Sequence, residues 1–430
     1  MVFGCIFRFA LAKRKFIRGL TPQKAIYPLT PPTQTNNLPT GAEALLIALA
    51  TPSPQGPTGI PVLLWGRPGV GKSSFIEGLA TDQLQVTTLI ASIHDPTDFS
   101  GLPVLDAGKV RYAVPEWVSD FDDKQAGVLF LDELSTAPPS VQAALLRVVF
   151  ERKVGFKPLP DSVRIVAAAN PPDLMVGGWE LSPPLRNRFV HLQWDIPENL
   201  YIRSLTEGWQ QGRIPEIDPT EHTRRLPDWK IKIGGFLRLK PDALYADPEA
   251  NRYGFASPRS WDFAAALLCS CELLGYRLGD RNGQSVILDL VTGCLGEATA
   301  LPLVEYLTNL RLPDPAEVLS GKTTIDVKEL DDAELYVLFY SLNAYLRRAF
   351  DTDELVPYSE VYLQFASEVF ADGRRDIIFV PLKELSRAGW LTKLTTAASR
   401  AGTQVQKAVT SQIARLFSDE AFNEFVDVLG

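Results

Sequence analysis

The chain has 430 residues, which is more than one ordinary domain and predicts two or three. Hydrophobic residues make up 46% and charged residues 22%, which excludes a disordered, collagen-like or coiled-coil chain. The net charge of −8 argues against a polycation built for nonspecific nucleic-acid binding. No run of 18 uncharged apolar residues occurs, so we expect no membrane span.

Cysteine usage is typical of a reducing compartment, and we therefore expect a cytoplasmic protein. The cysteines, too few for a disulfide scaffold of this length, are Cys5, Cys269, Cys271 and Cys294. Cys269 and Cys271 lie two apart in an apolar helical stretch and face different sides of it, which favours core packing over a metal site. The histidines share no ligand-like spacing and are expected to be structural or exposed: His94, His191 and His222.

The first 41 residues carry six basic side chains and no acid, which leaves about −14 for the rest of the chain. Arg8 interrupts the apolar start and no small-residue cleavage site follows, so a secretory signal fits poorly. One interpretation of residues 1–40 is a basic, poorly ordered arm or a misplaced start, and the other is a transit-like or membrane-surface segment. The proline-rich stretch 28–41 predicts a linker.

Short apolar runs alternate with helix-like segments from residue 41 onward. We expect a helix over 41–50 and buried strands at 61–65, 85–91, 127–133, 163–170 and 189–194. This alternation predicts an α/β core whose parallel sheet has helices on both faces. Residues 211–256 are rich in proline, glycine and charge and predict a connector with little regular structure, whereas the pattern is helical from residue 257 onward.

The clearest motif lies between the first expected strand and a helical run. Its residues fit G-x-x-x-x-G-K-[ST] in full: Gly66, Arg67, Pro68, Gly69, Val70, Gly71, Lys72 and Ser73. Glycines let backbone N–H groups converge on phosphates without Cβ clashes. Lys72 would neutralise the β- and γ-phosphates of ATP, Ser73 would ligate Mg²⁺, and Ser74 is included among the nucleotide-binding residues. An ordinary glycine turn is the alternative.

The apolar run 128–131 ends in two acids, Asp132 and Glu133. Unpaired carboxylates at the end of a buried strand are costly, so the pair needs a reason. A Walker B site supplies one, because Asp132 would hold Mg²⁺ through water and Glu133 would polarise the attacking water. An N-cap for the following helix is the alternative. The position about 60 residues after the P-loop favours the Walker B interpretation.

Further polar residues lie next to expected strands or helix starts. Asn170 ends the fourth expected strand, where it would touch the γ-phosphate or hold the water, or else form a turn before proline. Arg186 and Arg188 precede the last expected strand. Each is either ordinary surface charge or an arginine finger that reaches a neighbouring subunit's nucleotide. Arg259 lies in the first turn of a helix capped by Ser257, where its charge opposes the helix dipole and an anionic partner would repair that conflict.

Together these motifs resemble the AAA+ ATPases of the MoxR branch, over roughly residues 40–310 and most densely over 95–194. Residues 95–117 look like the helix-2 insert of that family, a small hairpin built into the core. Residues 131–154 look like its Walker B helix and a loop that often faces the pore, and residues 168–189 resemble sensor 1 and the segment leading to the arginine finger.

The resemblance implies an AAA+ P-loop core with a five-stranded parallel sheet over 41–210, including a hairpin insert near 95–118. After the connector over 211–256 it implies a helical lid over 257–320, and the chain then has an additional helical region over 321–430. By the same resemblance Asn170 is sensor 1, Arg188 the finger and Arg259 sensor 2. The family usually has Asp-Arg-Phe at the finger, whereas this chain has Asn-Arg-Phe at 187–189 and an extra Arg186, which leaves the choice between the two arginines open.

The resemblance also implies a homo-oligomeric, hexameric ring that hydrolyses ATP with Mg²⁺ and remodels or activates a protein, as a chaperone does. Each nucleotide would lie between two subunits, with Arg188 from one and the following residues from the other: Lys72, Ser73, Asp132, Glu133, Asn170 and Arg259. Residues 296–319 look like a segment of MoxR-type ATPases often encoded beside von Willebrand A-type proteins, which makes such a protein a candidate partner.

Two other functions fit parts of the sequence. A nucleic-acid motor is one, because related rings with similar inserts act on DNA, although the acidic total and the lack of a basic, aromatic binding module count against it. A nucleotide-gated scaffold with slow turnover is the other, and the intact Glu133 and Arg188 argue against it. Salt-dependent DNA binding would identify the first, and assembly by ATP without turnover the second.

Overall fold

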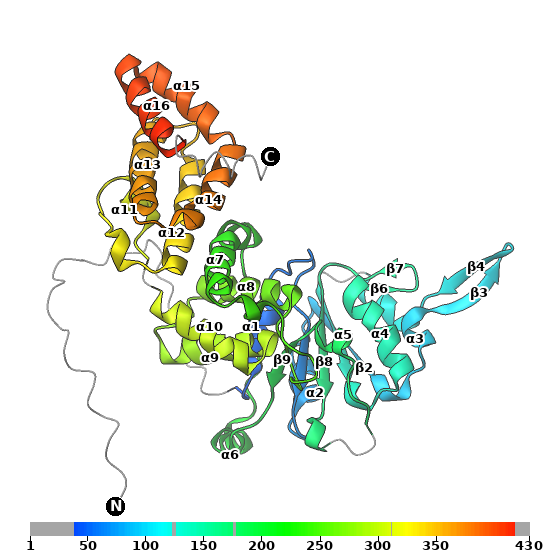
Figure 1. Ribbon diagram of the computed structural model, residues 1–430. Helices are drawn as coiled ribbons and strands as arrows, with labels where there is room; N and C mark the ends of the chain where they lie inside the picture. The colour runs from blue at the N-terminus through cyan, green and yellow to red at the C-terminus, as the bar shows by residue number, and fades with distance from the viewer. Residues whose placement is uncertain (1–37, 123–125, 175–177, 311, 418–430) are drawn as a thin grey trace, which may run out of the picture. The chain divides into compact units, whose positions relative to one another are not determined.

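The computed structural model describes residues 38–122, 126–174, 178–310 and 312–417 (Figure 1). The expected basic arm, Cys5 and most of the expected linker lie outside the described residues, as does the stretch 418–430. Of the helices that are described, none is at once long and apolar enough to cross a bilayer.

A five-stranded parallel sheet forms the centre of the core, with strand order β2-β5-β8-β1-β9. Its strands are β1 (Val62–Trp65), β2 (Leu84–Ile90), β5 (Ala126–Asp132), β8 (Val163–Ala169) and β9 (Val190–Gln193). All five expected strands are confirmed. Trp65, the last residue of β1, pairs with Ala169 on one side and Gln193 on the other. The carboxyl ends of the strands therefore meet at one edge, here named the carboxyl edge, and the opposite one is the amino edge.

Helices cover both faces of the sheet (Figure 1) because successive strand residues point to opposite sides. Val62 and Leu64 belong to one hydrophobic core, and Leu63 and Trp65 to a second core on the other face. The first core contains α1 (Ala42–Ala50), α8 (Pro258–Leu273) and α9 (Arg281–Leu295), and the second contains α4 (Pro139–Glu151). The expected helix over 41–50 and the expected layering are confirmed.

Shorter helices and strands connect or flank the main elements of the core. They are α2 (Lys72–Glu77), α3 (Thr97–Ser100), α5 (Pro183–Arg186), α6 (Glu198–Glu207), the hairpin of β3 (Leu102–Asp106) and β4 (Lys109–Ala113), and the two-residue strands β6 (Lys153–Val154) and β7 (Lys157–Pro158). The β3–β4 hairpin lies inside the expected insert near 95–118, and every residue of its two strands is exposed. The two small sheets touch through the rings of Tyr112 and Phe156, whose centroids lie 5.5 Å apart.

The prediction of little regular structure over 211–256 is wrong. This stretch contains α7 (Pro219–Leu239), a helix of 21 residues. Pro219 is its first residue, where a backbone N–H would have no partner within the helix, so the missing N–H of proline costs nothing. Asp218 caps the helix by accepting a hydrogen bond from the Thr220 N–H at 2.9 Å. The buried Trp229 and Phe236 anchor the helix in the first core, so tertiary packing outweighs its internal proline and glycines.

The expected helical lid contains α8, α9, α10 (Glu297–Asn309) and α11 (Pro315–Leu319). The C-terminal helices are α12 (Asp332–Arg348), α13 (Leu355–Ala371), α14 (Arg375–Arg387), α15 (Trp390–Ala401) and α16 (Thr403–Phe417). These helices enclose a third hydrophobic core, which also includes Val318 and Leu319. The C-terminal region thus begins with α11, a few residues before the boundary expected at 320.

The buried Cys269, Cys271 and His222 pack as structural residues, as expected. Cys269 and Cys271 are at most 1% exposed and pack in the first core. Burial raises the pKa of both thiols, that of Cys269 to about 12, which favours the neutral thiol form in the core. His222 is also buried, with its Nε2 3.0 Å from the Ala266 carbonyl.

Candidate functional site

The P-loop leaves β1 at the carboxyl edge and runs into α2. Gly69 and Gly71 have φ angles of 80° and 73°, which side chains other than glycine rarely adopt. Gly66 has no room for a Cβ, since that atom would lie 2.6 Å from the Trp194 carbonyl oxygen. Trp194 also donates its indole N–H to the Val70 carbonyl at 3.1 Å, so β9 and the strand end beyond it hold the loop in place.

Lys72 and Ser73 bring the two strongest motifs of the sequence together. The Lys72 Nζ donates to the carbonyls of Gly66 at 2.6 Å and Arg67 at 3.0 Å. Burial lowers the pKa of Lys72, and the Asp132 carboxylate raises it. The Ser73 hydroxyl donates to Asp132 Oδ2 at 2.6 Å. The P-loop and the acidic end of β5 therefore form one polar cluster beneath the position that a triphosphate would take.

This donor set fits Mg²⁺. A hydroxyl and one carboxylate are hard oxygen ligands, and Mg²⁺ usually keeps several waters and takes its other ligands from substrate phosphates. Ser73 and Asp132 would hold the ion with the nucleotide. Among the described residues, no group of three or more His, Cys, Asp and Glu side chains is placed to hold a metal. A site with one hydroxyl and one carboxylate suits an ion that takes its other ligands from water and the nucleotide.

Glu133 is held in an unusual backbone conformation at the carboxyl edge. Its φ of 55° lies in the left-handed region, which is uncommon for a residue with a side chain and concentrates at functional sites. Its backbone N–H donates to Asp132 Oδ1 at 2.8 Å, and its Oε2 accepts the Ser92 hydroxyl at 2.9 Å. Sequence reasoning missed Ser92, although a polar residue just past an expected strand was the signal available.

Asn170 follows β8 at the same edge. Its backbone N–H donates to the Ser135 hydroxyl at 3.2 Å, in the segment η3 (Leu134–Thr136) that follows Glu133. The carbonyl of Ala169 accepts the Gly66 N–H at 3.3 Å. Asn170 therefore lies between the first residue of the P-loop and the segment that carries Glu133.

Arg186 is committed to its own subunit. Its side chain is buried and donates to the carbonyls of Asn251 and Pro248, the latter at 3.0 Å. Burial lowers its pKa, and the nearby Glu249 and Glu180 carboxylates raise it. This guanidinium anchors the loop before α8, a role that leaves Arg188 as the arginine closer to solvent.

Arg188 and Arg259 lie on the same phenyl ring. The guanidinium carbons stand 4.4 Å and 5.2 Å from the centroid of Phe150, near the end of α4. Arg259 also donates to Asn187 Oδ1 at 3.3 Å, and Arg188 donates to the Pro184 carbonyl. Burial and then the charge of Arg259 lower the pKa of Arg188. Two cations thus share one aromatic partner, a concentration of positive charge suited to an anion.

Both arginines lie at the amino edge, away from the P-loop of their own chain. Arg188 precedes β9, whose first residue, Val190, pairs with the first residue of β1, whereas the P-loop follows the last one. Phe150 lies near the end of α4, a helix of 13 residues and about 20 Å that begins just after the Walker B segment. Arg259, in the first turn of α8, packs beside the finger segment, and its grouping with Lys72 in one subunit stays a prediction.

The comparison with protein families agrees with this geometry. Residues 61–189 match the family described as AAA domain (dynein-related subfamily). The core has the AAA fold. The match begins just before β1 and ends just before β9, so it includes the P-loop, the acidic end of β5, Asn170 and Arg188.

The AAA core is similar to parts of several curated proteins. Over 144 residues the chain is 34% identical to the Psp operon transcriptional activator of Escherichia coli, covering 31% of this chain and 44% of that protein. Over 222 residues it is 31% identical to Chaperone MoxR1 of Mycobacterium tuberculosis, covering 46% of this chain and 57% of that protein. The chain thus spans about half the length of these relatives.

A solved structure from Cytophaga hutchinsonii, described as that of an ATPase, aligns with 62% of this chain and 88% of its own length. The identity is 17% and the TM-score 0.37.

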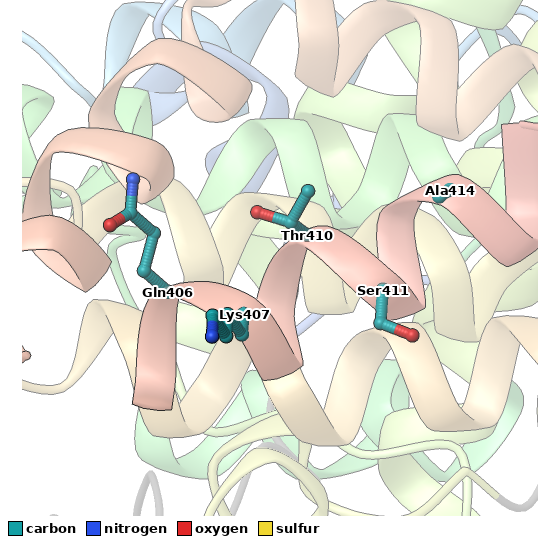
Figure 2. Close-up of a pocket in the computed structure, with 5 residues that line it drawn as sticks. All are labelled: Gln406, Lys407, Thr410, Ser411 and Ala414. Carbon is teal, nitrogen blue, oxygen red and sulfur yellow. The ribbon is translucent and has the colours of Figure 1, made fainter. Parts of the chain in front are cut away.

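Outside the AAA core, a surface hollow lies along α16 (Figure 2). Its lining residues all come from that helix: Gln406, Lys407, Thr410, Ser411 and Ala414. All of them are exposed, and they include neither an acid nor a cysteine or histidine. We assign no chemistry to this hollow, and the candidate nucleotide site is the cluster at the carboxyl edge.

Proposed function

We propose that this chain is an ATP-hydrolysing AAA+ ATPase whose nucleotide site is completed by a second copy in a closed ring, and that it remodels a protein partner. One observation carries the proposal. The phosphate-binding residues lie at the carboxyl edge of the sheet, and the cations Arg188 and Arg259 lie at the amino edge. A head-to-tail contact between copies would bring the two edges together, and such contacts form a ring when the rotation between copies closes.

In this proposal each side chain at the carboxyl edge has a distinct task. Lys72 binds the β- and γ-phosphates, and Ser73 and Asp132 hold Mg²⁺, which neutralises phosphate charge. Glu133 accepts the proton of the attacking water as its oxygen bonds to the γ-phosphorus and the bond to the bridging oxygen breaks. Asn170 holds that water or the γ-phosphate.

The neighbouring subunit supplies positive charge to the same phosphates. Arg188 fits the finger role better than Arg186, since Arg186 is buried and bound to the carbonyls of its own loop. Arg259 joins Arg188 because both touch Phe150. This assignment moves the proposed sensor 2 arginine to the partner's side of the interface.

A protein partner fits the surface better than a nucleic acid. The β3–β4 hairpin exposes apolar side chains on both faces, with Leu105 79% exposed, and Phe156 beside it is 71% exposed. Apolar surface of this kind binds polypeptide, whereas nucleic-acid backbones require clustered lysine and arginine. The similarity to a protein named a chaperone points the same way.

The decisive experiment measures ATP hydrolysis in mixtures of inactive subunits. Glu133→Gln should bind ATP without turnover, and Arg188→Ala should keep ATP affinity but lose turnover. Because a head-to-tail contact pairs unlike surfaces, a random 1:1 mixture should recover about a quarter of the wild-type rate. Arg147→Ala, an exposed arginine on α4 paired with Glu151 at 2.9 Å, is the matched control and should leave the rate unchanged.

Protein concentration gives a second, independent measurement. The rate per subunit of the wild type should rise steeply and then saturate as copies assemble. No recovery in the mixture would contradict a site shared between subunits. Assembly by ATP without any turnover would instead indicate the scaffold, and salt-dependent DNA binding would indicate a nucleic-acid motor.

A further inference from the structure

A chain of hydrogen bonds crosses the sheet from the P-loop strand to the finger segment. The indole N–H of Trp65, the last residue of β1, donates to His191 Nδ1 at 2.9 Å. His191 Nε2 lies 2.9 Å from the carbonyl oxygen of Arg186, two residues before Arg188. An indole can only donate, so Nδ1 must accept, and the single proton of the neutral imidazole lies on Nε2. His191 therefore donates to the Arg186 carbonyl, and both hydrogen bonds run in the same donor-to-acceptor direction, from Trp65 to His191 to Arg186.

The surroundings keep this chain rigid. His191 is buried on β9, and its ring stacks on Trp65 with centroids 6.0 Å apart and planes 13° apart. Tyr253 packs edge-on against Trp65 from the loop that precedes α8. An apolar residue would fill the His191 position without any desolvation cost. The imidazole instead makes two directional bonds, one to the Trp65 indole of β1 and one to the Arg186 carbonyl in the turn before β9.

Trp65, the first residue of this hydrogen-bond chain, lies next to Lys72, the proposed phosphate-binding lysine. Trp65 is bonded to Gly66, whose carbonyl oxygen accepts the Lys72 ammonium at 2.6 Å. A phosphate bound by Lys72 would compete with the Gly66 carbonyl for the Lys72 ammonium. Nucleotide binding in the P-loop would therefore change the hydrogen bonding of the peptide that follows Trp65. The Trp65 carbonyl also accepts the Trp194 N–H at 2.7 Å, which couples this peptide to the end of β9.

The Arg186 carbonyl, at the other end of this hydrogen-bond chain, lies in the turn that carries Arg188. The Arg186 carbonyl accepts both His191 and the Phe189 N–H, the latter at 3.1 Å, so the turn from 186 to 189 closes on this oxygen. The Arg188 side chain leaves from the middle of that turn. A displacement of the His191 ring would therefore change the hydrogen bonding of this turn.

We propose that Trp65 and His191 are positioning residues which make the orientation of Arg188 depend on what the P-loop of the same subunit holds. The inference rests on the proposed function, in which Arg188 acts on the next subunit's nucleotide. Occupancy of one site would then set the turnover of its neighbour through this chain of hydrogen bonds.

The experiment compares two kinds of finger donor in mixed rings. Arg188→Ala subunits supply the only working sites, and the donors supply the only working fingers. One donor carries Glu133→Gln and retains ATP, and the other carries Lys72→Ala and binds none. We expect the two mixtures, compared at equal donor incorporation measured by sizing, to differ in ATP turnover about fivefold or more.

The donors then receive a second substitution at His191. His191→Leu removes both hydrogen bonds and should bring the ratio of the two rates to about one. His191→Gln keeps one acceptor and one donor and should preserve the ratio, which a loss of packing alone would not explain. The donors' own sites are inactive in every mixture, so damage to donor catalysis does not enter the measurement.

Trp65→Phe breaks the chain from its other end and covers the case in which His191→Leu fails to fold, as thermal unfolding would show. Equal rates with unsubstituted donors, or a ratio that survives both His191→Leu and Trp65→Phe, would overturn the proposal. Absence of turnover in the Glu133→Gln mixture would instead contradict the shared site itself, and with it this inference.

Discussion

Ser92 donates a hydrogen bond of 2.9 Å to the Glu133 carboxylate and so joins the end of β2 to the Walker B motif. The two strands are neighbours, since Ile90 pairs with Asp132. A carboxylate oxygen that accepts a hydroxyl hydrogen bond is less free to turn toward another donor. This contact therefore restrains the residue that we propose accepts the proton of the attacking water.

Ser92→Ala should raise the basal ATPase rate by about tenfold or more, because breaking a hydrogen bond to a charged group costs about 1.5–3 kcal/mol. Ser92→Thr keeps the hydroxyl and is the matched control, which should retain the wild-type rate. Initial rates at saturating ATP measure the effect. A fall toward the rate of Glu133→Gln would mean that Ser92 places the carboxylate for catalysis and does not restrain it.

Phe150 offers a test of the shared arginine platform. Its ring is the common partner of Arg188 and Arg259. Without the ring, the two guanidinium groups would lose their cation–π contacts and repel each other. Phe150→Leu should lower turnover by about tenfold, the equivalent of 1.4 kcal/mol, while the dissociation constant for ATP stays unchanged. Phe156→Leu, at an exposed ring in the β6–β7 turn, is the control for basal turnover. A parallel loss of ATP affinity would place Phe150 in the P-loop's own site.

The sequence was sufficient to predict the P-loop and the acidic end of β5, because each motif is contiguous and the alternation of elements indicates a parallel sheet. It was insufficient for Ser92 and Phe150, whose roles depend on which strands are neighbours and where α4 ends. The position of Arg259 required the path of the loop before α8. Proline and glycine suggested an irregular connector where α7 lies, since the packing partners of that helix are far away in the sequence.

His191 predicts a pH dependence of stability. Burial is the main cause that lowers its pKa to about 4 from 6.5, the Arg186 charge lowers it further, and the bond to the Arg186 carbonyl raises it. A histidine with a lowered pKa contributes its full stability above the unfolded value of 6.5 and loses it as the pH falls toward 4. The loss between pH 7.5 and 4.5 should be about 2 kcal/mol more in the wild type than in His191→Gln.

Denaturant unfolding of the two proteins at both pH values, followed by circular dichroism, measures this difference. The comparison with His191→Gln removes the contribution of the many carboxylates that titrate over the same range. Equal pH dependence in the two proteins would mean that His191 titrates normally, and the neutral imidazole assigned to the chain between Trp65 and Arg186 would then be wrong.

Adjacent glycines in α7 give a final prediction with an internal control. A Cβ on Gly235 would lie 2.4 Å from Val337 Cγ2 in α12 and 2.6 Å from the Tyr306 hydroxyl in α10. Gly235→Ala should therefore lower the free energy of unfolding by about 1–3 kcal/mol, since the helices must separate. A Cβ on Gly234 would meet Tyr336 at 3.5 Å, an ordinary contact. Gly234→Ala should be neutral or stabilising by up to about 1 kcal/mol, because alanine favours a helix.

Thermal unfolding and limited proteolysis measure the two variants side by side. In Gly235→Ala we expect the C-terminal helices to become susceptible to protease before the AAA core, because the substitution acts where α7 meets α12 and not at the sheet. The ATP affinity of this variant should stay at the wild-type value, since the P-loop packs against β9. Equal stability of the two variants would contradict the close approach of α7 to α12 and α10.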